Sequence, residues 1–137
     1  MGDQIRRVEY FYVSVADKPG EGAKALSVLS EAGVNLLGFS GFPAARRAQL
    51  DFLPADPQAF RQVAKKAKWK LVGPKKAFLI QGQDRVGVAA EIHAQLAAAK
   101  INVKAFQAVV GCEECFGALL WVAPKDYNKA AKLLGAV

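Results

Sequence analysis

Hydrophobic residues along the chain follow two different periods, and the change from one to the other outlines the first elements. Residues 10–15 are rich in aromatic and β-branched side chains, which suit a half-buried strand, and this run stops at residues 17–20, Asp-Lys-Pro-Gly. Ala25, Leu29 and Ala32 then recur at helical spacing. The chain is therefore expected to open with a strand, a tight turn and a helix.

The same patterns predict elements along the whole chain. Strands are expected at about 7–15, 34–42, 48–53, 69–72, 76–82, 101–111 and 115–123, and helices at 20–32, 57–67, 86–99 and 125–134. The order is βαββαβ in the first series and βαββα in the second, with Gly73-Pro74 expected to break the chain between them. The second series has essentially no room for its fourth strand.

The two series are copies of each other at a constant offset of 67 residues, as from Asp17 to Asp84. The further pairs are Gly20 and Gly87, Ala23 and Ala90, Leu29 and Leu96, Ala32 and Ala99, Asn35 and Asn102, Phe11 and Phe78, and Val13 and Ile80. A fixed offset indicates a duplicated unit. We expect domains at 1–73 and 74–137, with Phe11, Phe78, Val13 and Ile80 in the cores.

The missing fourth strand has a consequence for the second copy. In a βαββαβ sheet of order 4-1-3-2, its absence leaves residues 77–81 of the first strand along an open edge. Exposed strand edges pair readily with other strands. We expect another strand, from the first copy or from a second chain, to cover this edge.

Composition places the chain among ordinary globular proteins, with 137 residues, 53% hydrophobic content and mixed charge. The net charge of +7 is concentrated between Arg61 and Lys76, where no acidic residue occurs. We interpret this basic segment as the solvated face of a helix and the linker after it, in preference to a polyanion-binding patch.

The chain shows no signal peptide, and its longest apolar run, residues 116–123, is too short to span a bilayer. We therefore expect a cytoplasmic protein with no membrane partner. Units of this size are also small for independent stability, which favours a shared surface or oligomerisation.

Residues 17–20, the helix that follows them and Gly33-Val-Asn35 resemble the signature of the ACT domain, an amino-acid-binding regulatory module. Residues 84–87 and 101–103 resemble a second one, so the resemblance covers nearly the whole chain. The arrangement is similar to stand-alone tandem ACT regulators of the glycine-cleavage repressor type. It implies an α+β protein of two ferredoxin-like ACT units, with antiparallel sheets, helices on one face, and a second unit lacking most of its fourth strand.

The resemblance also implies a function and a site. The expected function is regulatory binding of a small molecule, an amino acid, by a homodimer that is not an enzyme, carries no cofactor or metal, and acts on a regulated protein partner. In the family, ligands bind between the loop after strand one and the start of strand two, commonly across an interface between two units. By position, these residues are Asp17, Pro19, Gly20, Glu21, Asn35 and Leu36 in the first copy, and Asp84, Val86, Gly87, Val88, Asn102 and Val103 in the second.

Physical reasoning on the loops agrees with this site, because unpaired N–H groups at a helix start attract a carboxylate. Other roles remain open: Asp17 and Asp84 are candidates for helix caps, and Asn35 and Asn102 for hydrogen bonds at a strand start. Lys100 stands where the family usually has glycine.

Cys112 and Cys115 flank a predicted hairpin turn, and we favour reduced thiols there over a disulfide or a metal site. A zinc site would require two chains, because His93 is the single histidine and lies far along the sequence. His93 falls inside an apolar helix, where a packing role is favoured over that of a catalytic base.

Other functions are compatible with a βαββαβ order. A purely structural protein-protein interaction module would need no ligand. An RNA-binding module would use the basic segment. It would also need aromatic residues on the third strand, on the same face as Tyr10 and Tyr12 of the first, and the third strand lacks them. Nucleic acid is therefore not expected as a partner. An acylphosphatase-like enzyme would need a phosphate loop that Arg85 and Asn102 do not provide.

Overall fold

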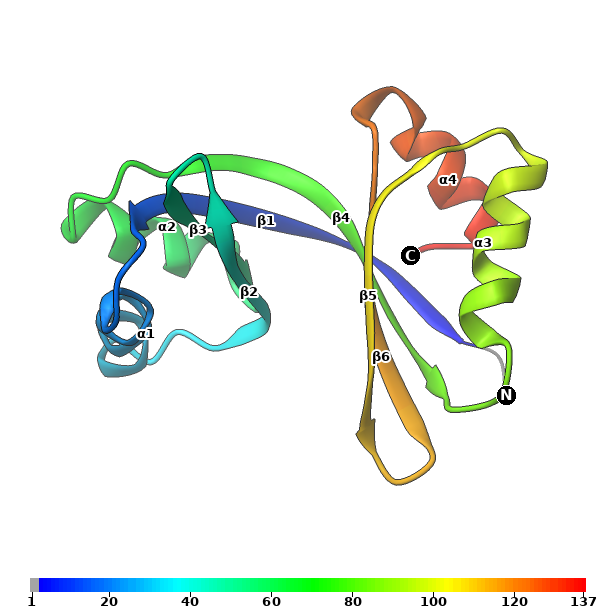
Figure 1. The fold of residues 1–137 in the computed structure, drawn as a ribbon, viewed down its shortest axis with the longest axis horizontal. Coiled ribbons are helices and arrows are strands. Elements are labelled where there is room, and N and C mark those ends of the chain that lie inside the picture. Colours follow the sequence, from blue (N-terminus) through cyan, green and yellow to red (C-terminus); the bar gives the residue numbers. More distant parts are fainter. Residues whose placement is uncertain (1–2) are drawn as a thin grey trace. The chain divides into compact units, whose positions relative to one another are not determined.

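The computed structural model describes residues 3–137 and has the expected alternation of strands and helices (Figure 1). The strands are β1 (Gln4–Ala16), β2 (Leu36–Ala44), β3 (Arg47–Pro54), β4 (Val72–Gln83), β5 (Val103–Cys112) and β6 (Cys115–Val122). The helices are α1 (Glu21–Glu31), α2 (Pro57–Lys66), α3 (Val88–Ala98) and α4 (Tyr127–Leu134), the last preceded by the short 3-10 helix η1 (Pro124–Asp126). The chain is thus α+β, with antiparallel strand pairing.

The chain forms two compact units. The first unit is Glu9–Lys75, and the second unit joins the residues up to Val8 to Lys76–Val137. Strands β1 and β4 each contribute residues to both units. The first residues of β1, which the sequence reading assigned to the domain 1–73, therefore lie with the second copy.

The expected break at Gly73-Pro74 is wrong, because β4 continues through both residues as one strand. Gly73 has a φ of 130°, and a Cβ on it would come within 2.9 Å of both the Phe11 ring and the Tyr10 carbonyl oxygen. The glycine is thus needed for close approach of β4 to β1, which is a role that glycine also takes inside strands.

The first unit has the strand order β2-β3-β1-β4, with α1 and α2 packed on one face of the sheet. Phe11 of β1 lies opposite Phe52 of β3, and both are fully buried together with Phe60 of α2. The Phe60 ring lies 5.1 Å from that of Phe11 and 5.3 Å from that of Phe52. This aromatic core confirms the prediction for Phe11 and Val13.

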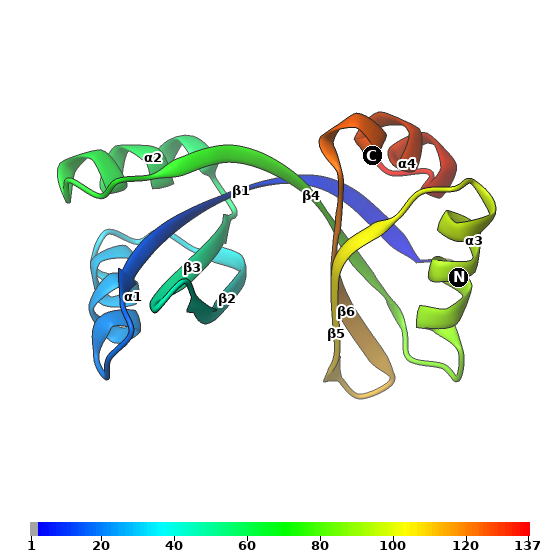
Figure 2. The same ribbon diagram turned by 45° about the horizontal axis from the view of Figure 1, so that its top comes forward.

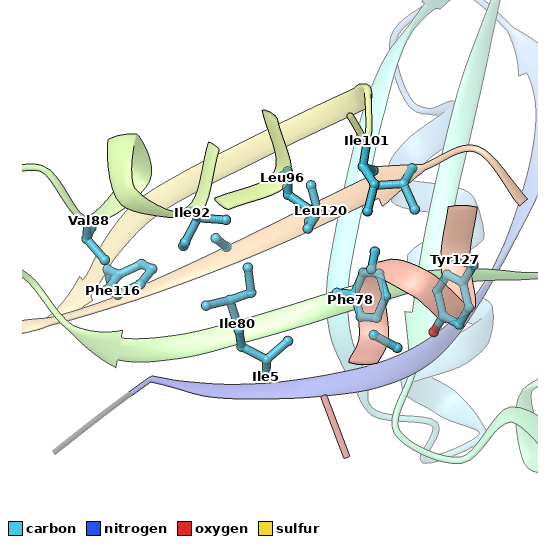
Figure 3. Packing of buried hydrophobic residues seen from close by; sticks show 14 residues of the cluster. Ile5, Phe78, Ile80, Val88, Ile92, Leu96, Ile101, Phe116, Leu120 and Tyr127 are labelled. Atoms are coloured by element: carbon cyan, nitrogen blue, oxygen red, sulfur yellow. The ribbon is translucent and has the colours of Figure 1, made fainter. Parts of the chain in front are cut away.

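The second unit has the strand order β1-β4-β6-β5, and its apolar core lies between the sheet and α3 and α4 (Figure 3). Along β6, alternate residues are buried from Phe116 to Val122, as expected for a strand with one face against a core. Phe78 and Ile80 are fully buried, which confirms the prediction for these two residues.

The edge of the second copy is covered by β1, which lies beside β4 in the strand order. Ile5 of β1 is buried in the second core, and Arg6 donates a hydrogen bond to the Gln81 side chain over 3.4 Å. Val137 adds two backbone hydrogen bonds to β1, with Ile5 and Arg7, of 3.0 and 2.8 Å. The expectation that a strand from the first copy or a second chain covers this edge is confirmed, and the strand is the chain's own first one.

Figure 2 shows the helices from a second direction, and none of them is long. In the part of the chain that the structure covers, no helix has the length and apolar character needed to cross a membrane.

Candidate functional site

The loop before α1 is shaped by Gly20. This residue is the N-cap of α1, adopts a left-handed conformation with a φ of 93°, and leaves the helix without a side-chain cap. The prediction that Asp17 caps the helix is therefore wrong, and Asp17, like Pro19, is exposed. Because the first N–H groups of a helix have no partner within it, the loop presents free amides at Glu21 and its neighbours.

The loop before α3 repeats this geometry. Gly87 is the N-cap of α3 with a φ of 87° and again no side-chain cap, so Asp84 does not cap the helix either. The Asp84 N–H donates instead to the Glu114 carbonyl at the β5–β6 turn, over 2.9 Å. Val86 is fully exposed, whereas Val88 is buried in the second core. Of Val88, only the backbone can therefore face a ligand at this loop, and its N–H already donates to the Arg85 carbonyl oxygen over 3.4 Å.

The electrostatics of the two loops differ. The Arg85 guanidinium forms an ion pair with the Glu91 carboxylate of α3, and its Nη2 atom lies 4.0 Å from Oδ2 of Asp3. The hydrogen bond to Glu91 raises the pKa of the Arg85 guanidinium, which is charged at any ordinary pH in either case. The second loop thus carries a cation already held by acidic neighbours, while the first loop carries Glu21.

The predicted asparagines lie at the other end of each helix. Asn35 precedes β2, its carbonyl accepts the Ala55 N–H over 2.9 Å, and its side chain makes no hydrogen bond to residues 3–137. Asn35 and Leu36 line a pocket of about 400 Å³ together with the last turns of α1. In the second unit, Asn102 is exposed and Val103 is half-buried at the start of β5.

The structure does not bring the loop and the asparagine of one unit together. Helix α1, which separates Gly20 from Asn35 along the chain, has 11 residues, and α3 has the same length. At 1.5 Å per residue each helix is about 16 Å long, which is more than a single amino acid can span. The predicted ligand-binding residues of each unit therefore fall into two separate groups, one at either end of its first helix.

Backbone conformation explains one departure noted in the sequence. Lys100 follows α3 with a φ of 61°, in the left-handed region, where its counterpart Gly33 has a φ of 73°. This region is costly for residues other than glycine. The turn geometry is thus the same in both copies, although only the first uses the residue that favours it.

The remaining sequence candidates have packing roles. Cys112 and Cys115 are joined in a disulfide across the β5–β6 turn, with Cα atoms 5.2 Å apart, so the favoured interpretation as reduced thiols is wrong. His93 contacts the Phe106 ring edge-on at 4.6 Å, and its Nδ1 lies 2.8 Å from the Ala89 carbonyl oxygen. It is thus a packed histidine, as expected.

A buried carboxylate lies on the sheet of the first unit. Asp51 of β3 is 6% exposed and lies opposite Tyr12 of β1 in the strand register. Burial raises its pKa, opposed by the Gln49 amide, which donates to it over 2.8 Å, and by the charge of Lys75. Burial, followed by the Asp51 charge, also raises the pKa of Tyr10. No sequence signal pointed to Asp51.

Sequence reasoning also missed the larger pocket of the first unit, which has a volume of about 960 Å³. Its wall is a polar stripe of α2 that faces Glu9, Trp69 and Leu71. The stripe consists of Gln58, Arg61, Gln62 and Lys65, which share one helix face by their spacing. This spacing is visible in the sequence, but the opposing wall is not.

Comparison with known proteins rests on structure, because no protein-family model and no curated protein matches the sequence. Protein BT0572 from Bacteroides thetaiotaomicron is similar over 97% of this chain and 88% of its own, with a TM-score of 0.78 and 14% identity. The ligand-free regulatory subunit of aspartate kinase from Thermus thermophilus is similar over 98% of this chain and 95% of its own, with a TM-score of 0.67 and 16% identity.

A structure of aspartokinase alpha and beta subunits is similar over the same shares, with a TM-score of 0.66 and 18% identity. At these identities the likeness concerns the fold. The chain has the α+β fold of aspartate kinase regulatory subunits, which is the fold that the resemblance to ACT domains predicted.

Proposed function

We propose that this protein is a tandem ACT-type regulator that binds an amino acid and has no catalytic activity of its own. One observation carries the proposal: both copies begin their first helix at a left-handed glycine, Gly20 or Gly87, with no side chain capping the amides. Such a helix start is suited to a carboxylate, which all amino acids carry. The two βαββαβ units would act as a cytoplasmic homodimer that reports ligand to a protein partner.

The separation of these two groups of residues supports a binding site shared between two copies of the chain. A ligand carboxylate at the loop around Gly20 cannot also reach Asn35 of the same unit, because α1 lies between them. A complete site would combine the loop of one chain with the asparagine end of a second chain. Ligand binding would then stabilise one arrangement of the two chains, which is how a binding module transmits a signal.

The test is a thermal-shift screen of the full chain against the twenty amino acids, followed by calorimetry on each hit. A ligand at a hundred times its dissociation constant stabilises the folded state by about 2.7 kcal/mol, which such a screen detects. Asn35→Ala and Asn102→Ala then identify the working copy. We expect one variant to weaken binding at least tenfold while the other retains it.

Sedimentation with and without the hit separates a shared site from a site within one unit. A site between two chains predicts that ligand strengthens the dimer. If no amino acid shifts the melting temperature, the proposal fails, and the protein is better described as a structural module that pairs with other proteins.

A further inference from the structure

The large pocket of the first unit combines features of a binding site that neither the sequence nor the fold assigns. It lies between α2 and the segment that leads into β4, and all its lining residues belong to the first unit. Its volume of about 960 Å³ is at the upper end of the range for small-molecule sites. It is also more than twice as large as the hollow at Asn35.

Two cations of the pocket are available for a ligand. Arg61 and Lys65 lie one helical turn apart on α2, so their side chains can reach one anionic group together. Within residues 3–137 neither forms a salt bridge or a side-chain hydrogen bond. An arginine and a lysine at this spacing fit a phosphate, which accepts several charge-assisted hydrogen bonds.

The lining also contains two acidic residues, Asp56 and Glu9, which equal the two cations in number. The Asp56 carboxylate caps α2 by accepting the N–H groups of Gln58 and Ala59, over 3.1 and 3.2 Å. Glu9 makes no ion pair within the described part of the chain. It is therefore available to accept a hydrogen bond from an amino or hydroxyl group of a ligand.

Trp69 supplies a fixed aromatic wall. Its indole stacks on the Phe52 ring at a centroid distance of 5.6 Å and an interplanar angle of 20°, and it also contacts Phe60 at 6.2 Å. The half-buried Trp69 also lines the pocket. Because packing against the core already fixes its ring, ligand binding would cost little further side-chain conformational freedom. Stacking on such a ring suits a nucleobase, because every base has an aromatic face.

We propose that this pocket binds a mononucleotide. The base stacks on Trp69, the phosphate lies between Arg61 and Lys65, and Glu9 accepts a hydrogen bond from the base or the ribose. This proposal does not depend on amino-acid binding at the helix starts. It assigns a function to part of the basic segment that the sequence left as a solvated helix face.

The test follows Trp69 fluorescence during titration with AMP. The chain has two tryptophans, so Trp121→Phe makes Trp69 the single reporter, and calorimetry on the unmodified protein checks that background. We expect saturable quenching by AMP, with at least tenfold weaker binding of adenosine and of inorganic phosphate. Absence of saturable AMP binding in both assays would overturn the proposal, as would phosphate binding as tight as that of AMP.

A matched pair of double variants separates a built site from general charge attraction. Arg61→Gln with Lys65→Gln removes the two pocket cations, whereas Lys66→Gln with Lys70→Gln removes two neighbouring cations that do not line the pocket. We expect the first pair to weaken AMP at least tenfold and the second pair less than twofold. Equal loss in both would overturn the proposal. Any amino-acid response should be unchanged in both, which keeps the two functions distinguishable.

Discussion

The hydroxyl of Tyr127 offers a sharp test of how the second unit is held together. Tyr127 is 5% exposed, its ring stacks on Phe78 at 4.5 Å, and its hydroxyl donates to the Ala77 carbonyl oxygen over 2.9 Å. The stacked pair and the red oxygen of Tyr127 are visible in Figure 3. Tyr127→Phe removes this hydrogen bond and keeps the ring.

The magnitude follows from what each substitution removes. One buried hydrogen bond contributes about 1 kcal/mol to the free energy of unfolding. Tyr127→Leu also removes the ring, its stacking on Phe78, and the contacts of Arg7 and Lys76, whose charged groups lie 5.9 and 5.5 Å from the ring centre. The smaller leucine also leaves a cavity. We therefore expect the free energy of unfolding of the leucine variant to fall by about 3–4 kcal/mol in total.

The assay is urea denaturation, with hydrogen exchange to locate the effect. For Tyr127→Phe we expect a lower urea midpoint at unchanged slope, and about fivefold faster exchange of the slowest amides in β4 and β6. Amides of the first unit's core serve as the internal control. An unchanged midpoint, or a phenylalanine variant as unstable as the leucine variant, would refute this account of the hydroxyl.

Three further substitutions test the backbone and the buried carboxylate, all by urea midpoints. Gly73→Ala should destabilise the protein by about 2 kcal/mol or more, because its Cβ would collide with Phe11 at a φ of 130°, and a neutral result would contradict this. Lys100→Gly should stabilise by about 1 kcal/mol by relieving a φ of 61°, and a loss would count against the strain. Asp51→Asn should stabilise at neutral pH, because the pKa of Asp51 is raised in the folded state. The gain should vanish as the pH falls below 3.8, where both states are protonated, and a pH-independent gain would refute the cause.

The sequence by itself determined the duplication and the positions of most elements. The alternation around Phe11 and Phe78 identified the first strand of each copy and its core face, and both residues are fully buried. These signals are local, because strand and helix periods are written in neighbouring residues. The two Gly-containing loops at the starts of α1 and α3 could also be predicted, because their signal lies in adjacent residues.

Tertiary structure decided what depends on distant residues. The first residues of β1 belong to the second unit because Ile5 is buried in a cluster with residues far along the chain, such as Ile80 (Figure 3). The caps at Gly20 and Gly87 depend on backbone angles that the nearby aspartates did not reveal.

The pocket on α2 shows the same division. Its helix stripe can be read from the sequence, but the pocket exists only because the fold brings Glu9 and Trp69 together with Arg61. Periodicity fixes which face of an element is buried, whereas long-range packing fixes what that face meets.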